Sequence, residues 1–418
     1  MRKAIIVTGL SFGDEAKGSV VDYLTRQYKA HTVIRHNGGS QAAHHVVTPD
    51  GVTHCFSQFG AGTFAGAKTF LSKYMIVDPI ALVNEANHLI ELGWHPWDYI
   101  KIDQECKIIT PYHKFTNRHL ENQRGIKRHG SCGVGVGQVM DDYVNYDRWL
   151  TFSDILEGDL VNRLADFKIL HNKKCGENLI DSVRLDDFFD AVQFLIDKNV
   201  IGTNNDLEAI LKKDGTIICE GAQGVLLDEW QGFHPHTTWS TCTAENAFNL
   251  LLENDFIGSV SKLGLIRAFM TRHGPGPFPT YDVNLHFEEK HNAFGEYQRE
   301  FRFGYLDLAL IKYAIKANKG VLGLALSHLD QIQDETKVCI GYENFGGNLV
   351  VDFERDESKL TRQNYLGQHL DVARPILVTV KKENLVSFIE DKLKTKIYLI
   401  SSGPTFLDKV LTKDVFET

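Results

Sequence analysis

The sequence predicts an α/β protein with a large, mostly parallel central sheet flanked by helices. One observation is a set of short apolar runs, rich in β-branched residues and bounded by glycine or polar turns, as buried strands are. These runs are AIIVTGL (4–10), HTVIRH (31–36), TIICEG (216–221), LGLALSHL (322–329) and IYLISSG (397–403). The second observation is helical periodicity next to these runs, at 16–28 and 306–318. Strands that alternate with helices favour a parallel sheet.

The 418 residues contain neither a convincing linker nor a low-complexity stretch. We therefore expect a single domain that spans residues 1–418. Between about residues 86 and 215 the patterns are mainly helical, as in LDDFFDAVQFLI (185–196). This region is the expected helical insertion.

Composition restricts the possible functions. A hydrophobic content of 43% is enough for a sizeable core, and a net charge of -9 disfavours nonspecific binding to nucleic acid, which needs Lys and Arg. No apolar run is long enough for a membrane span, so we expect a cytoplasmic protein. The seven cysteines are scattered and never form CxxC, which predicts reduced packing residues. Cys132 stands apart because it lies in the glycine-rich HGSCGVGVG (129–137), although no partner base for a nucleophile is visible.

Glycine-rich or polar segments supply the candidate binding loops, and several directly follow a predicted strand. In parallel sheets ligands collect at the carboxyl ends of strands. The segments are 10–19, 36–45, 129–137, 220–224, 271–280, 327–330 and 401–404.

The first of them, LSFGDEAKGS (10–19), reads as a phosphate-binding loop. A turn at Gly13 followed by a helix start near Gly18 would point backbone N–H groups and Lys17 at a phosphate. The spacing differs from the usual GxxxxGK[ST]. Asp14 and Glu15 would repel a phosphate unless a divalent cation lies between them or one carboxylate acts as a base.

The second loop, HNGGSQAAHH (36–45), places His44 after several small residues that allow close backbone approach. A histidine there can donate a proton or stabilise charge that develops on an oxygen. His45 is the competing candidate for the same role.

Together these motifs resemble those of adenylosuccinate synthetases. GDEAKG, NGGSQAAHH, GSCGVGVG, EGAQGVLLD, TRHGPGPFPT, FGEYQREFRFGYLDL and SSGP occur here in the order of that family's GDEGKG, NAGH, GTTGRGIGP, EGAQGTLLD, TRVGAGPFPT, aspartate loop and STGP. The resemblance covers essentially the whole chain and implies a P-loop-related fold and a C–N bond-forming ligase.

The family's reaction explains the acids in the phosphate loop. A carboxylate removes the N1 proton of a 6-oxopurine nucleotide, O6 attacks the γ-phosphate of a nucleoside triphosphate, and the amine of aspartate then displaces phosphate. By resemblance, Asp14 is the base, Lys17 holds phosphates, His44 stabilises the transferred group, and Gln223 contacts the purine. Mg²⁺ is the implied cofactor, held at Asp14 and Ala43.

The resemblance also implies a contact set for each substrate and a homodimer. For the triphosphate the residues are Gly13, Asp14, Glu15, Ala16, Lys17, Gly18, Ser19, Ala43, His44, His45, Ser327, His328, Asp330, Ser401, Ser402 and Gly403. For the purine monophosphate they are Gln41, Ser131, Cys132, Gln223, Thr238 and Arg148. For L-aspartate they are Arg299, Arg302 and Tyr297, and the arginine fork suits its carboxylate.

Several positions depart from the family pattern. The segment that would read the guanine of GTP is SHLD, which keeps Asp330 but has His328 in place of lysine. Gln41 replaces an asparagine and Val134 an arginine. Ala16 and Ala43 replace glycines, and the arginine expected from a neighbouring subunit falls near Tyr146, two residues before Arg148.

These departures surround the substrate base and sugar, so our leading hypothesis is a different acceptor. The chain resembles a branch of the family that is encoded by bacteriophages which replace adenine in their DNA with 2,6-diaminopurine. That branch condenses dGMP with aspartate and tends to use ATP or dATP. The alternative is an ordinary adenylosuccinate synthetase that uses IMP and GTP. A third hypothesis, a nucleotide-binding protein without catalysis, is disfavoured because the catalytic and binding residues are all retained, namely Asp14, Lys17, His44, Gln223 and Arg299. None of the three involves nucleic acid or a membrane.

Overall fold

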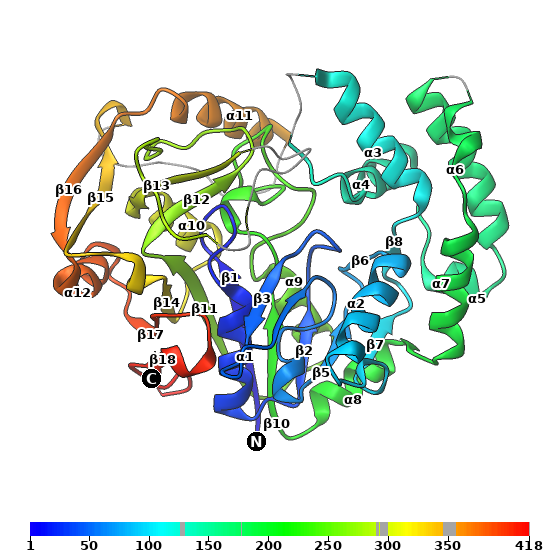
Figure 1. Cartoon of the computed structure of the whole chain (residues 1–418), viewed down its shortest axis with the longest axis horizontal. Helices are drawn as coiled ribbons and strands as arrows, with labels where there is room; N and C mark the ends of the chain where they lie inside the picture. The colour runs from blue at the N-terminus through cyan, green and yellow to red at the C-terminus, as the bar shows by residue number, and fades with distance from the viewer. Residues whose placement is uncertain (126–129, 177, 290–291, 293–299, 346–356, 418) are drawn as a thin grey trace.

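The computed structural model describes residues 1–125, 130–176, 178–289, 292, 300–345 and 357–417. Its centre is a ten-stranded sheet in which all neighbouring strands are parallel except the last pair, β17 and β18 (Figure 1). In spatial order the strands are β18 (Lys409–Leu411), β17 (Ile397–Ser401), β14 (Gly323–Ser327), β11 (Ser259–Arg267), β1 (Arg2–Gly9), β10 (Gly215–Glu220), β2 (Thr32–Arg35), β5 (Lys68–Leu71), β7 (Ile100–Asp103) and β9 (Ile201–Gly202). The five predicted strands are β1, β2, β10, β14 and β17, so the predicted fold class is confirmed.

The middle strand β1 is apolar from Ala4 to Val7 because both of its faces are buried. It lies between β10 and β11, and residues on both of its faces are buried. Ile5 and Val7 belong to one hydrophobic cluster, whereas Ala4 and Ile6 belong to another on the opposite face. A parallel strand covered on both sides reads as a continuous apolar run rather than an alternating one.

Helices cover both faces of this sheet, since residues 20–24 share one cluster with Ile5 and Val7, and residues 207–211 and 247–251 share the other with Ala4 and Ile6. The α-helices among the described residues are α1 (Lys17–Tyr28), α2 (Pro79–Glu91), α3 (Pro111–Arg124), α4 (Val136–Tyr146), α5 (Phe152–Leu156), α6 (Leu160–Cys175), α7 (Asp186–Asp197), α8 (Asn204–Lys212), α9 (Glu245–Glu253), α10 (Leu308–Ala317), α11 (Glu357–Leu370) and α12 (Lys382–Leu393). Within the described residues, none of them combines the length and hydropathy needed to cross a bilayer.

The region expected to be a helical insertion, 86–215, holds α3 to α8, which stand to one side of the molecule together with α2 (Figure 1). It also supplies β7 and β9 to the central sheet. The sequence analysis did not predict these two short strands. Their inclusion ties the region to the sheet through main-chain hydrogen bonds.

Smaller β-structures flank the central sheet. A second sheet contains β12 (Phe269–His273), β13 (Phe301–Asp307), β15 (Glu335–Tyr342) and β16 (Pro375–Lys381). A hairpin joins β3 (His44–Val47) to β4 (Thr53–Phe56), and β6 (Ile76–Val77) pairs with β8 (Lys107–Ile108). The hairpin begins at His44 and packs on α1, which brings the second candidate loop next to the first.

Asp307 is a buried carboxylate that links the second sheet to α10. It caps α10 by accepting a hydrogen bond from the Leu310 N–H at 3.0 Å, and it accepts another from the Tyr342 hydroxyl at 2.5 Å. Burial raises the pKa of Asp307 to about 6. The folded protein therefore holds a proton that the unfolded chain has released between about pH 4 and 6, and its stability falls as pH rises through this window.

We expect Asp307→Asn to remove this part of the pH dependence, because asparagine keeps the capping oxygen without the charge. A pKa about two above the ordinary value corresponds to roughly 3 kcal/mol. The free energy of unfolding, measured in urea, should decrease from pH 4 to pH 8 by less in the variant than in the wild type. The two decreases should differ by up to about 3 kcal/mol. Asp190→Asn, on the exposed side of α7, is the control. A variant whose pH dependence matches the wild type would contradict this role of Asp307.

Candidate active site

The phosphate loop is folded around the side chain of Glu15. Its Oε1 accepts hydrogen bonds from Ser11 N–H (2.9 Å), Ser11 Oγ (2.6 Å) and Gly13 N–H (3.0 Å), and its Oε2 lies 2.5 Å from Lys17 Nζ. Burial alone would raise the pKa of Glu15, but the Lys17 ammonium and the Ser11 hydrogen bonds lower it below its ordinary value. The carboxylate is fully buried. Glu15 was predicted among the triphosphate contacts; its side chain holds the loop from inside and does not line the cavity.

The same fold turns Asp14 outward. Gly13, Asp14 and Ala16 all have positive φ angles, of 95°, 61° and 66°. Such a sequence of left-handed residues is costly outside glycine and persists only where the surroundings enforce it. Here the Glu15 hydrogen bonds enforce it. The Asp14 side chain is 23% exposed, and its Oδ2 lies 3.6 Å from His273 Nε2.

Three glycines let the candidate loops touch through their backbones. A Cβ at Gly224 would lie 2.1 Å from the Ser11 carbonyl oxygen, and one at Gly18 would lie 2.7 Å from the His44 carbonyl carbon. A Cβ at Gly9 would lie 2.8 Å from the Gln223 carbonyl oxygen. The motifs EGAQG, GDEAKG and the loop before His44 thus pack directly against one another.

His44 is held by a residue that the sequence analysis quoted but did not assign. Its Nδ1 lies 2.5 Å from Glu220 Oε1, and Glu220 Oε2 accepts a hydrogen bond from the Ala61 N–H at 3.0 Å. Burial lowers the pKa of His44 despite the neighbouring carboxylate. Burial would raise the pKa of Glu220, but the charge of Arg35 and the contact with His44 lower it. A neutral His44 therefore donates Nδ1–H to an ionised Glu220, which leaves Nε2 for another contact.

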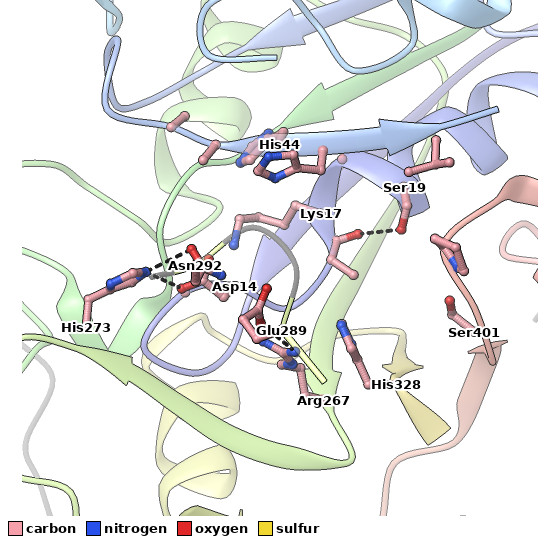
Figure 2. Close-up of a pocket in the computed structure, with 18 of the residues that line it drawn as sticks. Asp14, Lys17, Ser19, His44, Arg267, His273, Glu289, Asn292, His328 and Ser401 are labelled. Atoms are coloured by element: carbon pink, nitrogen blue, oxygen red, sulfur yellow. Dashed lines mark hydrogen bonds and ion pairs between the residues drawn. The ribbon is translucent and has the colours of Figure 1, made fainter. Parts of the chain in front are cut away.

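These groups line one cavity of about 610 Å³, shown in Figure 2. Lys17 and His44 approach it from one side, whereas Asp14, His273 and Arg267 lie on another (Figure 2). The predicted site residues that line it are Gly13, Asp14, Ala16, Lys17, Gly18, Ser19, Gln41, Ala43, His44, His45, Gln223, His328, Asp330, Ser401 and Gly403. They come from five segments far apart in the sequence.

Two buried amide oxygens in this region lack a hydrogen-bond partner among the described residues. They are Oε1 of Gln41 and Oε1 of Gln223. Unpartnered buried polar atoms are uncommon in native proteins and mark places where a ligand or water binds. Both glutamines were predicted to contact the purine nucleotide.

Other predicted residues do not line the cavity. Ser131 Oγ accepts a hydrogen bond from Asn117 Nδ2, and Thr238 N–H donates to the Leu227 carbonyl. Burial raises the pKa of Cys132 to about 11, which argues against a thiolate nucleophile. Arg148 is on the surface, 3.5 Å from Asp166.

The expected aspartate residues lie only partly within the described structure. Arg302 donates to the carbonyl oxygens of Gly274 (2.5 Å) and Gly276 (3.1 Å), so its guanidinium holds the GPG turn. Arg299 and Tyr297 lie outside the described residues.

In the SHLD segment, Ser327 was predicted to contact the triphosphate but lies behind the phosphate loop. Ser327 Oγ donates a hydrogen bond to the Glu15 carbonyl oxygen at 3.3 Å and does not line the cavity, so it links β14 to the phosphate loop.

Burial lowers the pKa of His328 well below its ordinary value, which makes the ring neutral. Lys409, whose pKa burial lowers to about 8, feels the charge of nearby Asp330. Ser402 makes a main-chain hydrogen bond to Asp408.

Several cavity residues were missed. Arg267 ends β11, so the rule about carboxyl ends of strands would have found it had this strand been predicted. His273 stands where the quoted family motif has valine, a difference that the analysis did not use. Glu289 and Asn292 come from an irregular segment without a sequence signal, and Asn292 Oδ1 lies 3.1 Å from His273 Nε2.

Comparison with known proteins gives consistent results. The family model for adenylosuccinate synthetase matches residues 6–409. Adenylosuccinate synthetases of Pelodictyon phaeoclathratiforme and Shewanella amazonensis are 28% and 30% identical, over 96% and 97% of both chains. Among solved structures, fully ligated adenylosuccinate synthetase from Plasmodium falciparum has a TM-score of 0.80 at 19% identity, covering 98% of this chain and 99% of that one. Cyanophage S-2L succinoaminodeoxyadenylate synthetase (PurZ), bound to dGMP and dATP, has a TM-score of 0.61 at 15% identity, covering 99% and 97%.

A parallel sheet with a phosphate loop at the end of its central strand defines a nucleotide-binding α/β enzyme. The chain belongs to the adenylosuccinate synthetase family, whose members are C–N bond-forming ligases. The two curated relatives named above are adenylosuccinate synthetases, whereas the phage protein is similar in fold alone. The comparisons thus favour the ordinary synthetase over the dGMP-specific branch that the sequence analysis put first.

The His44–Glu220 pair should act as one unit in turnover. We expect His44→Ala to lower kcat by about 100-fold or more, the scale for loss of a group that stabilises developing charge. Glu220→Gln should cost at least about 10-fold, since an amide cannot stabilise a protonated imidazole as a carboxylate does. His45→Ala should cost far less.

The double variant provides the check. If the two residues act together, its kcat should lie close to that of His44→Ala alone. Losses that multiply would show that Glu220 acts independently of His44.

Proposed function

We propose that this enzyme is an adenylosuccinate synthetase that joins L-aspartate to C6 of IMP, with GTP as the phosphoryl donor. The observation that carries the proposal is the meeting of Asp14, Lys17 and the His44–Glu220 pair at one cavity. The names of the curated relatives support it. Asp330, exposed at the cavity, suits the N–H groups of a guanine edge.

In the first step, the Asp14 carboxylate takes the N1 proton of the purine. The electron pair moves to O6, which attacks the γ-phosphorus, and the nucleoside diphosphate leaves. Lys17 contacts the phosphate oxygens. When His44 is protonated, its Nε2–H donates to the transferring group while Glu220 stabilises the imidazolium. In the second step, the aspartate amine attacks C6, loses a proton, and displaces O6 as inorganic phosphate.

The residues at Asp14 fit Mg²⁺. Among the described residues, Asp14 belongs to no group of three metal-ligating side chains. This suits Mg²⁺, which keeps several waters and binds through one or two carboxylates and substrate phosphates. Asp14 would hold the ion through its carboxylate and Ala43 through its main-chain carbonyl. When bound, Mg²⁺ neutralises charge on the phosphates.

A second candidate function is condensation of dGMP with aspartate, driven by ATP or dATP. One structural observation favours it. The 2-amino group of guanine needs a hydrogen-bond acceptor, and Gln41 supplies a buried oxygen without a partner among the described residues, where the family has asparagine. The neutral His328 in place of lysine also favours a donor other than GTP.

Asp14→Asn tests the proposed base. We expect it to fold and bind nucleotide but to lose about 100-fold or more in turnover. Glu15→Gln, at the neighbouring carboxylate, is the matched comparison. This variant should have a lower thermal midpoint, because the Lys17 ammonium is left buried without its partner. Full activity in Asp14→Asn would remove this residue from the mechanism.

The acceptor is tested with purified enzyme, Mg²⁺ and aspartate, combining IMP or dGMP with GTP or ATP and identifying products by mass. We expect kcat/KM for IMP with GTP to exceed that for dGMP by at least about 10-fold, the lower end of discrimination by pocket shape. A preference for dGMP that Gln41→Ala abolishes would establish the second candidate instead. Absence of product with every pair would favour a non-catalytic nucleotide-binding protein.

A further inference from the structure

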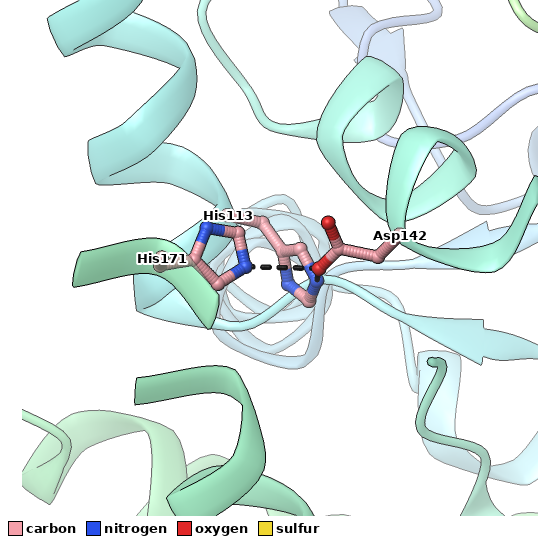
Figure 3. Close-up of side chains that lie close together, drawn as sticks. All are labelled: His113, Asp142 and His171. Carbon is pink, nitrogen blue, oxygen red and sulfur yellow. Dashed lines mark ion pairs between the residues drawn. The ribbon is translucent and has the colours of Figure 1, made fainter. Parts of the chain in front are cut away.

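Three buried side chains in the helical region form a cluster that takes no part in the proposed reaction. His113 lies on α3, Asp142 on α4 and His171 on α6, and all point toward a common centre (Figure 3). One nitrogen or oxygen atom from each lies within 4.8 Å of the others, and their side chains are at most 1% exposed. None of them lines the nucleotide cavity.

The contacts within the cluster are short, and although burial would raise the pKa of Asp142, the two imidazoles lower it through these contacts. Asp142 Oδ2 lies 3.2 Å from His113 Nε2 and 2.9 Å from His171 Nε2. All three atoms nonetheless lack a hydrogen-bond partner among the described residues. Zinc lies about 2.0–2.2 Å from nitrogen and oxygen ligands, which places neighbouring ligand atoms roughly 3–3.5 Å apart. The two nitrogen–oxygen distances are close to this spacing, and the two histidine nitrogens lie within 4.8 Å of each other.

The surroundings support the same role. Each histidine has its other ring nitrogen, Nδ1, 2.8 Å from a threonine hydroxyl, Thr110 for His113 and Thr116 for His171. Donation of Nδ1–H to such a partner leaves Nε2 free to bind a metal, and metal-ligating histidines usually have this outer contact. Lys174 contacts the other oxygen of Asp142, Oδ1, so Oδ2 remains available.

A competing contact affects the proton balance. The Thr110 N–H also points at His113 Nδ1, at 3.0 Å. Without a metal, this contact favours the tautomer in which Nε2 carries the proton. Metal binding to Nε2 displaces that proton. Its transfer to Nδ1 breaks the contact with the Thr110 N–H and replaces it by donation to the Thr110 hydroxyl.

We propose that His113, Asp142 and His171 bind a divalent transition metal of the Zn²⁺ type. Imidazole nitrogens favour zinc and its neighbours over Mg²⁺, so this site is distinct in chemistry from the one at Asp14. Its ligands come from three helices, so the ion cross-links α3, α4 and α6. Helix α4 begins at Val136, directly after the loop that contains Ser131 and Cys132, and the ion thus fixes the base of that loop.

Cobalt titration of the whole protein tests the site. Tag-free enzyme is stripped with a chelator and titrated with Co²⁺ in excess Mg²⁺, which occupies the site at Asp14. We expect one equivalent of Co²⁺ to bind with the visible absorption of a nitrogen- and oxygen-ligated centre, to be displaced by Zn²⁺, and to raise the thermal midpoint. Failure of the stripped wild type to bind Co²⁺ or Zn²⁺ stoichiometrically would overturn the proposal, whatever the variants do.

Variants locate the binding. His113→Gln and His171→Gln should each weaken Co²⁺ binding by more than the roughly 10–100-fold that loss of an outer partner costs. His119→Gln, on the same helix as His113, is the control and should bind as the wild type does. Equal binding by all three variants would assign the ion to surface histidines and overturn the proposal.

Discussion

The geometry of the active site depends on the buried carboxylate of Glu15. It gathers Ser11, Gly13 and Lys17 around itself, accepting hydrogen bonds from all three. The backbone then has to pass through left-handed conformations at Asp14 and Ala16. These turns present Asp14 to the cavity and start α1 at Lys17. A residue that contacts no substrate in the proposed mechanism thus sets the position of two that do.

Glu220 has the corresponding role on the next strand. Val7 of β1 and Glu220 of β10 are register partners, so the two loops leave adjacent parallel strands at the same edge. Each loop is organised by an inward-facing glutamate, and Gly224 lets the two backbones meet. The motifs GDEAKG and EGAQG therefore occur together because they are two halves of one packed structure. The acid in each motif orients a cationic or imidazole group, Lys17 in one case and His44 in the other.

The sequence was sufficient for β1, β2, β10, β14 and β17, because these buried parallel strands have an apolar pattern that ends in a glycine or polar turn. It did not predict β11, which begins with the partly polar residues SVSK, or the short strands β5, β7, β9 and β18. The inward direction of the Glu15 side chain was not predicted, because sequence gives the order of residues in a turn but not which way each side chain points. Glu220 and His273 were visible in the quoted motifs, yet their roles follow from contacts with residues about 180 and 260 positions away. Long-range contacts of this kind have no local signature.

The charges around the cavity explain why the proposed reaction would need a divalent ion. Lys17 is paired with Glu15, and Arg267 lies 3.5 Å from Glu289. These cations are thus partly neutralised before any phosphate arrives, and Asp14 adds a negative charge on the same side. A nucleoside triphosphate brings several more. Attraction between paired cations and such an anion is weak, so the phosphates need a counter-charge that arrives with them. In return, a paired Lys17 and a carboxylate-held His44 are already fixed in position, and binding costs little reorganisation of the groups that must stabilise the transferred phosphoryl.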